Sequence, residues 1–349
     1  MSLSFDVSTN SSLGVKGEDD CDNTSCTREN YGTTITTESY YIHIVGITPV
    51  ALLGIVGNLV SLVVWNSQTT YSATIFLFKY LAVWDTAYLV SVIPVIFLYE
   101  VDPTGVAFIL LNTLSFLAKL ESVHTTLLIA FTRWLAVYRP VHVHTGSLLT
   151  RRHVVLACLV VLVWCLAISA VFLAFDLVSV TFIAELSGYS AIHTVGLSLP
   201  ALPLFVFNFA LIKKIRSPSS LKSTASASEQ KQFSSRTSDQ RLTVTILFMS
   251  FFNVAAYTIG ETVKIFYWFQ AFRDNSNLFT TPESSFELLQ VVNSSVNFIF
   301  YITFSSKFRS SFTKCLKCRV LRGRAVSAGR PVASSHRQDS SHSLATTAL

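Results

Sequence analysis

Charged residues are scarce in this sequence. They make up 13% of its 349 residues, whereas soluble domains of this size carry about 25%. Hydrophobic residues make up 51%, and long apolar runs recur along the chain. The formal net charge of +6 is spread too unevenly to indicate a nucleic-acid-binding protein, because acidic and basic residues gather in different loops. The composition therefore predicts a polytopic membrane protein.

The sequence also lacks the motifs of common enzymes. It has no Gly-rich phosphate loop, no metal-spaced cluster of His and Cys, and no Ser-His-Asp arrangement. We therefore expect no catalytic residue and no organic cofactor, and we do not expect an enzyme. The first forty residues have no apolar core of a cleavable signal peptide.

Seven apolar segments of spanning length predict an all-α membrane protein, a bundle of seven transmembrane helices over residues 41–305. None of them shows the period-two alternation of a membrane β-strand. The expected spans are 41–66, 73–99, 108–138, 152–175, 192–216, 241–268 and 284–305. An odd number of spans puts the two termini on opposite sides of the membrane. The basic residues of the C-terminal tail and alternate loops place the C-terminus in the cytoplasm and the N-terminus outside, as in a plasma-membrane protein.

The stretch from Phe108 to Pro140 predicts the central helix of this bundle. Lys119, Glu121 and His124 lie in its middle. A charge at membrane depth costs at least about 2.5–3.5 kcal/mol, so such residues face a protein interior or a wet cavity. Lys119 and Glu121 are two residues apart and diverge around the helix, so we do not expect them to pair.

Two flexible ends flank the predicted bundle. Residues 1–40 are polar and predict a disordered extracellular tail, with glycosylation sequons at Asn10 and Asn23. Cys21 and Cys26 predict a small local disulfide, with free thiols or an intermolecular link as equal alternatives. Residues 319–349 predict a disordered cytoplasmic tail.

Residues 306–318 predict an amphipathic helix on the inner membrane surface. Phe304, Phe308 and Phe312 recur at fourfold spacing with basic residues between them. Cys315 and Cys318 at its end are candidates for palmitoylation, and unmodified cytosolic thiols are the alternative.

Motifs on six of the seven segments resemble the rhodopsin-like (class A) G-protein-coupled receptors. The matching residues are Gly57-Asn58, Leu81-Ala82-Val83-Trp84-Asp85, Thr132-Arg133-Trp134 with Pro140, Trp164, Pro200, and Asn293-Ser294-Ser295-Val296-Asn297-Phe298-Ile299-Phe300-Tyr301. They occur in the family's order on the expected spans. The resemblance implies a receptor that binds an extracellular ligand and activates a heterotrimeric G protein.

Asp85 is a carboxylate near the middle of the membrane, where it needs a partner or a proton. The resemblance implies that five polar residues converge on it: Asn58, Ser122, Asn293, Ser294 and Asn297. Carboxylate, hydroxyl and amide oxygens suit a hard cation, so we expect a sodium-type pocket. The alternative is a hydrogen-bonded core with neutral Asp85 and no ion.

The resemblance assigns G-protein coupling and activation to Thr132, Arg133, Trp134, Asn208, Asn297 and Tyr301. Relatives carry an acid where Thr132 stands, and that acid restrains the arginine at rest. Here the restraint is absent or is replaced by the threonine hydroxyl, which predicts elevated basal activity. Asn208 replaces a tyrosine that usually latches the active state.

The resemblance also implies a ligand-binding cavity in the extracellular half. Its residues are Ser115, Phe116, Lys119, Glu261, Lys264, Glu283, Glu287 and Gln290. Lys119 and Glu287 are the expected ion pair across it, in either a ligand-binding or a purely structural role. Amine receptors of the family hold their ligand with an aspartate where Ser115 stands, which argues against that class.

Further departures from the family pattern lie in the outer half and in the sixth and seventh spans. Phe108 occupies the place of the usual cysteine, and the outer loop at about 176–191 has no cysteine. The sixth span lacks its proline, although Asn253 could loosen the helix. Asn297-Phe298 stands where Asn-Pro is usual, which is similar to invertebrate FMRFamide-type neuropeptide receptors.

The sequence thus favours a receptor for a neuropeptide. A chemosensory receptor for small molecules is the alternative, because the outer disulfide is missing, and a transporter or channel is the remote one.

Thr347-Ala348-Leu349 fits a PDZ-domain ligand. Serines 334, 335, 340, 341 and 343 are expected targets of receptor kinases, which recruit arrestin; an ordinary solvated tail is the alternative.

Overall fold

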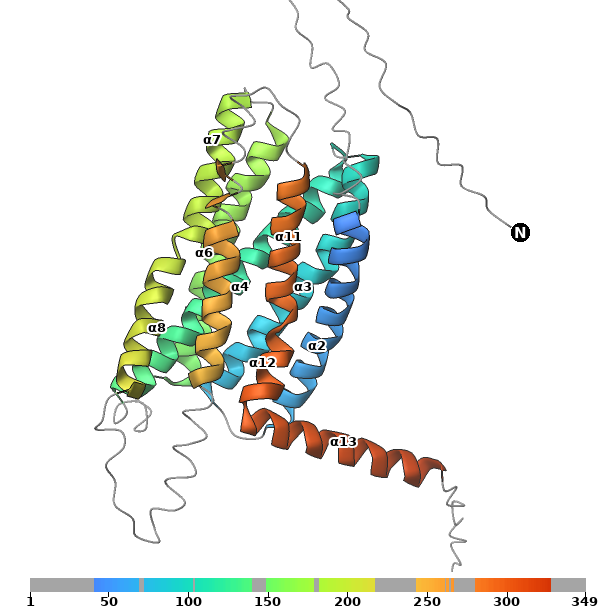
Figure 1. The fold of residues 1–349 in the computed structure, drawn as a ribbon, viewed down its shortest axis with the longest axis vertical. Helices are drawn as coiled ribbons and strands as arrows, with labels where there is room; N and C mark the ends of the chain where they lie inside the picture. The colour runs from blue at the N-terminus through green and yellow to red at the C-terminus, as the bar shows by residue number, and fades with distance from the viewer. Residues whose placement is uncertain are drawn as a thin grey trace, which may run out of the picture. The chain divides into compact units, whose positions relative to one another are not determined.

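The computed structural model describes residues 41–68, 72–102, 104–139, 149–178, 182–216, 243–260, 262–263, 265–266 and 280–327. They all belong to one compact unit, Ile35–Leu349. The elements are η1 (Ile42–Ile47), α2 (Thr48–Asn66), α3 (Ala73–Val101), α4 (Val106–Tyr138), α6 (Arg151–Leu177), α7 (Phe182–His193), η2 (Thr194–Ser198), α8 (Ala201–Arg216), η4 (Ala255–Ile259), α11 (Thr280–Ser295), α12 (Asn297–Phe304) and α13 (Ser306–Ser327). Helices make up the whole described bundle (Figure 1).

The spans agree with the sequence prediction. Five helices are long and apolar enough to cross a membrane: Ile42–Asn66, Ala73–Tyr99, Val106–Tyr138, Arg151–Leu177 and Gly188–Lys214. Ser284–Phe304 passes the same test together with the helix that follows it, and Thr243–Thr258 is a shorter apolar helix. The predicted all-α membrane fold is confirmed.

The fifth span begins earlier than expected. Residues 182–191 were predicted to belong to an outer loop, but they form most of α7. The Tyr189 hydroxyl donates to Asp176 at the end of α6, and the Tyr189 ring packs against Phe172 and Phe175. A Cβ on Gly188 would overlap the Phe175 ring, so glycine allows the two helices to approach closely. These contacts hold α7 helical outside the predicted span.

Two spans contain a π-helical turn near the residues at which the sequence suggests an irregular helix. Pro200 has no N–H to donate, and the turn before it is a π-helix in which Leu199 N–H donates to Thr194 oxygen at 2.8 Å. In the sixth span, η4 begins two residues after Asn253, although this span has no proline. A π-helical turn therefore lies next to Pro200 in the fifth span and shortly after Asn253 in the sixth.

The last span is interrupted at Val296 without a proline. α11 ends at Ser295, Val296 has φ −81° and ψ −8°, and α12 starts at Asn297. Phe298 occupies the place of the usual proline, and it packs against Phe308 and Phe312. The break thus accompanies side-chain packing against α13.

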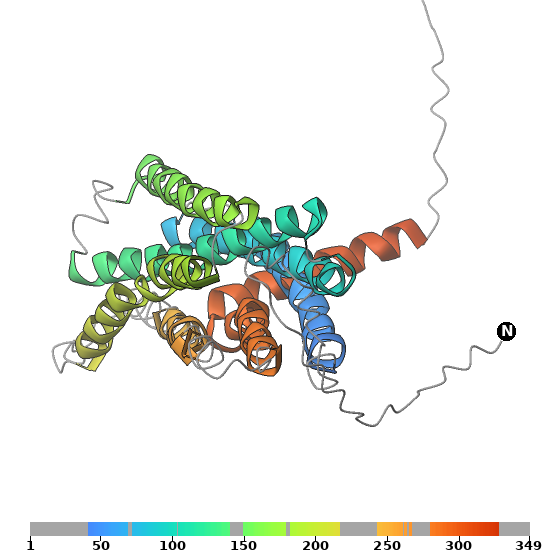
Figure 2. The same ribbon diagram turned by 90° about the horizontal axis from the view of Figure 1, so that it is seen from above.

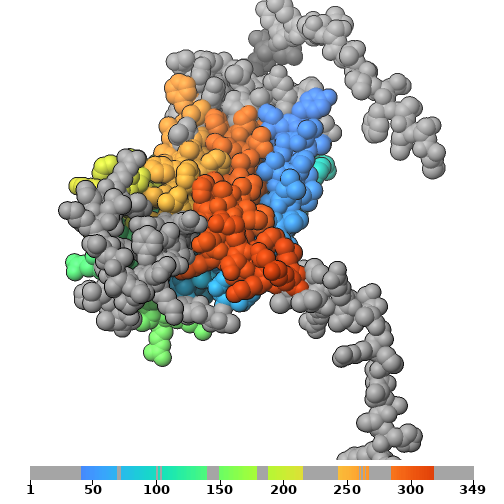
Figure 3. Space-filling model, turned by 60° about the horizontal axis from the view of Figure 1, so that its bottom comes forward, coloured from blue at the N-terminus to red at the C-terminus, as the bar shows by residue number. Residues whose placement is uncertain are grey.

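α13 turns away from the last span by 93° (Figure 2). The Ser305 hydroxyl accepts from Phe308 N–H at 3.2 Å, and Arg309 Nη1 donates to the carbonyls of Ile302 (3.1 Å) and Thr303 (2.7 Å). These bonds satisfy backbone groups at the corner between the two helices. Figure 3 shows α12 and α13 together at this end of the molecule.

α13 also differs from its prediction in two ways. It continues to Ser327, beyond the expected end at 318. Phe304 belongs to α12 and stacks on Phe248 of the sixth span at 4.8 Å, so it is not part of the amphipathic helix. Phe308 is fully buried and packs against Trp65, which joins α13 to the bundle core.

α4 has the central position predicted for it. It packs against α3, α6, α8 and η2. Its inward face is buried from Ser115 to Thr126 with few interruptions. Functional side chains at both ends of the bundle therefore share one helix.

Candidate functional site

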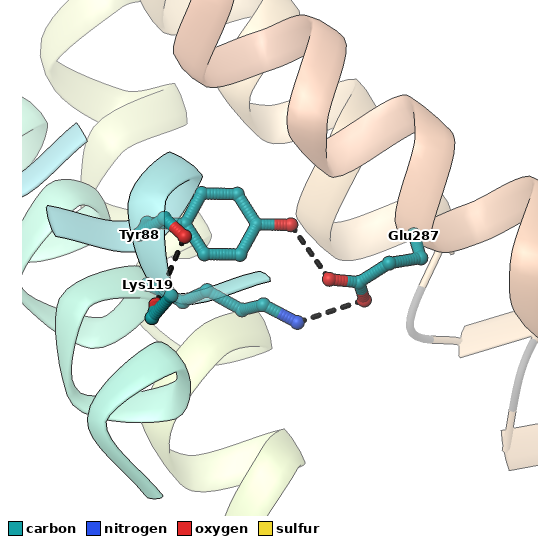
Figure 4. Close-up of polar contacts among 4 residues, drawn as sticks. Tyr88, Lys119 and Glu287 are labelled. Atoms are coloured by element: carbon teal, nitrogen blue, oxygen red, sulfur yellow. Dashed lines mark hydrogen bonds and ion pairs between the residues drawn. The ribbon is translucent and has the colours of Figure 1, made fainter. Parts of the chain in front are cut away.

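A largely buried polar triad joins three helices in the half of the bundle away from α13. Lys119 Nζ of α4 lies 2.8 Å from Glu287 Oε2 of α11. The hydroxyl of Tyr88, on α3, donates to Glu287 Oε1 at 2.7 Å (Figure 4). Lys119 Nζ also lies 5.2 Å from the centre of the Tyr88 ring. The expected ion pair is thus present, and both carboxylate oxygens are hydrogen-bonded.

Tyr88 is the member of this triad that the sequence reasoning missed. It is fully buried on α3, three residues after Asp85. Residues three apart lie on one face of a helix, so the inward position of Asp85 was the signal that could have found Tyr88.

The other expected ligand residues divide into three groups. Ser115 and Gln290 are buried on α4 and α11. Phe116 stacks on Phe172 of α6 at 4.4 Å and lies 5.1 Å from His193, which ends α7. Glu261 and Lys264 lie outside the described residues, as does the side chain of Glu283.

Phe108, which stands where relatives have a cysteine, makes an aromatic contact with the preceding span. Phe108 of α4 lies 6.0 Å from Tyr99 of α3, ring centre to ring centre. Both residues are near the helix ends at this side of the bundle, so α3 and α4 are joined there by packing.

The Asp85 carboxylate is the centre of a second polar cluster, one level deeper. It is fully buried. Ser122 donates to Oδ1 at 2.7 Å, and Asn297 Nδ2 donates to Oδ2 at 2.6 Å. The cluster therefore links α3, α4 and α12 at the point where the last span is broken.

Asn58 extends this cluster to the first span. Its Nδ2 donates to the Ser294 backbone carbonyl at 2.9 Å, while its Oδ1 is buried and has no hydrogen-bond partner among the residues that the structure describes. Gly57 allows this approach, because a Cβ there would lie 3.1 Å from the Cβ of Phe298. Asn293 is buried on α11.

The activation residues lie toward the α13 end. Arg133 is half-buried, and the Thr132 hydroxyl donates to its own helix at Ile129 oxygen, 2.9 Å away. Asn208 and Tyr301 are buried, and neither Asn208 amide atom nor the Tyr301 hydroxyl is hydrogen-bonded within the described chain. The structure does not bring these two side chains into a hydrogen bond.

Trp134 belongs to an aromatic cluster between α4 and α8. Its ring packs against Phe131, Tyr138 and Phe207 at 5.5–6.0 Å between centroids. The Tyr138 hydroxyl donates to Ala210 oxygen of α8 at 3.1 Å. This cluster fixes the end of α4 next to the fifth span.

Glu121 points away from Lys119, as its spacing predicts. It is fully buried and accepts a hydrogen bond from Tyr80 of α3 at 3.1 Å. His124 Nδ1 lies 2.8 Å from the Leu120 carbonyl, which can only accept, so Nδ1 carries the proton. Cys165 Sγ of α6 lies 3.8 Å from the same nitrogen.

Several predicted modification sites cannot be placed. Asn10, Asn23, Cys21 and Cys26 lie outside the described residues, as do the C-terminal Thr347–Leu349 and the serines before it. Cys315 is half-buried on α13 with a free thiol, and Cys318 is on the same helix, but its side chain is outside the described part.

The bundle with its buried polar clusters and motif-bearing helices defines a G-protein-coupled receptor, a multi-pass membrane protein with a ligand and a heterotrimeric G protein as partners. The family model that matches is that of the serpentine type 7TM GPCR chemoreceptor Srw, over residues 177–319. The match runs from the end of α6 through most of α13, which is less than half of the chain. No curated protein matches the sequence significantly.

Proposed function

We propose that this receptor is a chemoreceptor whose resting state is held by the Lys119–Glu287 ion pair. The observation that carries the proposal is the buried bridge from α4 to α11, reinforced by Tyr88 of α3. The matching family is named for chemoreceptors, and the alternating loop charges support an extracellular position for this half.

In this mechanism the ligand enters beside Glu287 and separates it from Lys119. α4 carries both Lys119 and Arg133, so a change at the first position is transmitted to the G-protein end. The ligand shifts an equilibrium that already exists between closed and open forms. The pair is 11% and 20% exposed, between surface and core, so its loss favours the open form by roughly 1–3 kcal/mol.

The test is basal G-protein activation of Lys119→Met in cell membranes. We expect basal nucleotide exchange to rise, because the bridge is lost while an unbranched side chain, one heavy atom shorter than lysine, remains. Lys79→Met is the matched control, since Lys79 is a half-buried lysine of α3 that forms no ion pair with a described residue. Equal basal activity in wild type and Lys119→Met would refute the restraint.

We further propose that the Asp85 cluster binds a sodium ion at rest. The buried carboxylate, the Ser122 hydroxyl and the unpaired Asn58 Oδ1 supply oxygens of the type a hard cation prefers. Sodium is then expected to lower basal activity in the wild type but not in Asp85→Asn. Identical sodium titrations of the two would contradict this.

A peptide ligand is the second candidate, favoured by the acidic residues of the N-terminal segment. These are Glu18, Asp19, Asp20, Asp22, Glu29 and Glu38. A sequence segment rich in acidic residues attracts a basic or amidated peptide. Calcium release through a promiscuous G protein, measured with amidated neuropeptides and with small odorants and metabolites, separates the candidates. A saturable peptide response lost in Glu287→Gln would support the peptide, and a small-molecule response the chemoreceptor.

We propose palmitoylation of Cys315 and Cys318 as the anchor of α13 on the inner membrane surface. Cys315 has a free thiol on a helix that runs at 93° to the last span, which supports this position. Acyl-exchange labelling is expected to detect acylation that disappears when both cysteines are replaced by serine. Arrestin, receptor kinases and a PDZ-domain protein remain the proposed partners of the C-terminal tail.

A further inference from the structure

The two partners of the ion pair are not equally accessible. The Glu287 side chain is 20% exposed and that of Lys119 is 11% exposed. Lys119 is held on two sides, by the Glu287 carboxylate at 2.8 Å and by the Tyr88 ring at 5.2 Å. A ligand that reaches this bridge therefore meets the carboxylate more readily than the ammonium.

An anionic ligand would face two costs at this position. It would approach Glu287 with like charge, and it would have to expel a carboxylate whose two oxygens accept from Tyr88 and Lys119. Removing one partner of a hydrogen-bonded charge pair leaves the other uncompensated.

A cationic ligand approaches Glu287 with opposite charge, and the cost that remains is the displaced Lys119 ammonium. It replaces one ammonium by another on Glu287, and the Tyr88–Glu287 hydrogen bond stays in place. The displaced Lys119 can remain over the electron-rich face of the Tyr88 ring.

The charged residues at this end of the bundle also favour a cationic ligand. In the described residues, Asp102 at the end of α3 and Asp176 near the end of α6 lie on the Lys119 side of the bundle. The described lysines and arginines other than Lys119 lie in the half that contains Arg133 or in α13. Clustered charge of one sign draws oppositely charged ligands toward a site.

We propose that this site binds a ligand through a primary ammonium or guanidinium group, which pairs with Glu287 in place of Lys119. The inference rests on the proposed function only in placing the ligand beside the ion pair. Lys119 is then a built-in competitor of the ligand, and its removal strengthens ligand binding.

The experiment uses two variants that break the same ion pair in opposite ways. Lys119→Met leaves Glu287 to bind an added cation, whereas Glu287→Gln leaves Lys119 to bind an added anion. The probes are phenylalkylamines and phenylalkyl carboxylates of equal chain length, added to the purified full-length receptor. The readout is the melting temperature as a function of probe concentration, since a ligand that binds only the folded state raises it.

We expect the amines to raise the melting temperature of Lys119→Met and to leave Glu287→Gln unchanged. The wild type should need on the order of tenfold more amine for the same shift, because Lys119 competes. Lys119→Gln repeats the measurement should the methionine variant fold poorly. Stabilisation of Glu287→Gln by the carboxylates, with no effect of the amines on Lys119→Met, would overturn the proposal, as would no response to either probe.

The same variants keep this proposal separate from the proposed function. Both variants break the bridge, so both should raise basal nucleotide exchange if the bridge restrains the receptor. Wild-type basal activity in both would refute the restraint while the melting curves still decide the charge of the ligand.

Discussion

The attachment of α13 to the bundle can be tested with a single substitution, Phe308→Ala. Phe308 is fully buried, and its ring lies 5.0 Å from Trp65, 5.5 Å from Tyr301 and 5.9 Å from Phe298. These three partners come from α2 and α12. The substitution removes the ring that joins the helix at the surface to the two spans.

The expected loss of stability in Phe308→Ala follows from the burial of the ring and its aromatic contacts. Truncation of a buried phenylalanine to alanine costs about 3–5 kcal/mol, in line with three aromatic pairs at about 0.5–1.5 kcal/mol each plus lost burial. A domain of this size loses about 2 °C in melting temperature per kcal/mol, so we expect a fall of about 6–10 °C.

The assay is thermal unfolding of the purified receptor, with Leu316→Ala as the matched control. Leu316 is an apolar residue of the same helix, and 49% of its surface is exposed. The control is expected to melt close to the wild type. A Phe308→Ala variant that melts within about 1 °C of the control would show that α13 does not depend on this ring.

Three further predictions concern other helix contacts. Gly54→Ala places a Cβ 2.7 Å from Leu89 Cδ1, so we expect a loss of about 1–3 kcal/mol and reduced surface expression; normal expression and melting would contradict the packing. Tyr80→Phe leaves the buried Glu121 without that donor and should lower stability by about 1–3 kcal/mol in the same melting assay, whereas an unchanged melting temperature would show that the hydrogen bond contributes nothing. Thr132→Asp supplies the missing acid and should lower second-messenger output without ligand; equal output would remove the idea of elevated basal activity.

The spans were predictable because their signal is local. Length, apolarity and charge asymmetry act within each segment and need no knowledge of neighbours. The helical form of 182–191 was not predicted, because it depends on contacts with Phe172, Phe175 and Asp176 of another helix. The break at Val296 was not predicted, because residues 284–305 were expected as one span and the proline that usually accompanies such a break is absent.

Part of the candidate site was also predictable from the sequence. A lysine and a glutamate at membrane depth need partners, which pointed to Lys119 and Glu287 before their distance was known. Tyr88 was missed because its signal is indirect: it follows only from its position three residues after Asp85 on the inward face of α3. The Tyr80–Glu121 hydrogen bond was not predicted either. The spacing along α4 shows that Glu121 points away from Lys119, but it does not show which residue of another helix Glu121 meets.

The position of Ser122 on α4 has a mechanical consequence. Its hydrogen bond to the buried Asp85 fixes one point of the helix, three residues from Lys119 and eleven residues from Arg133. At a rise of about 1.5 Å per residue these are arms of about 4.5 Å and 16.5 Å. A rigid rod turning about that point has arms of unequal length, so a shift of about 1 Å at Lys119 corresponds to a displacement of about 4 Å at Arg133, in the opposite direction.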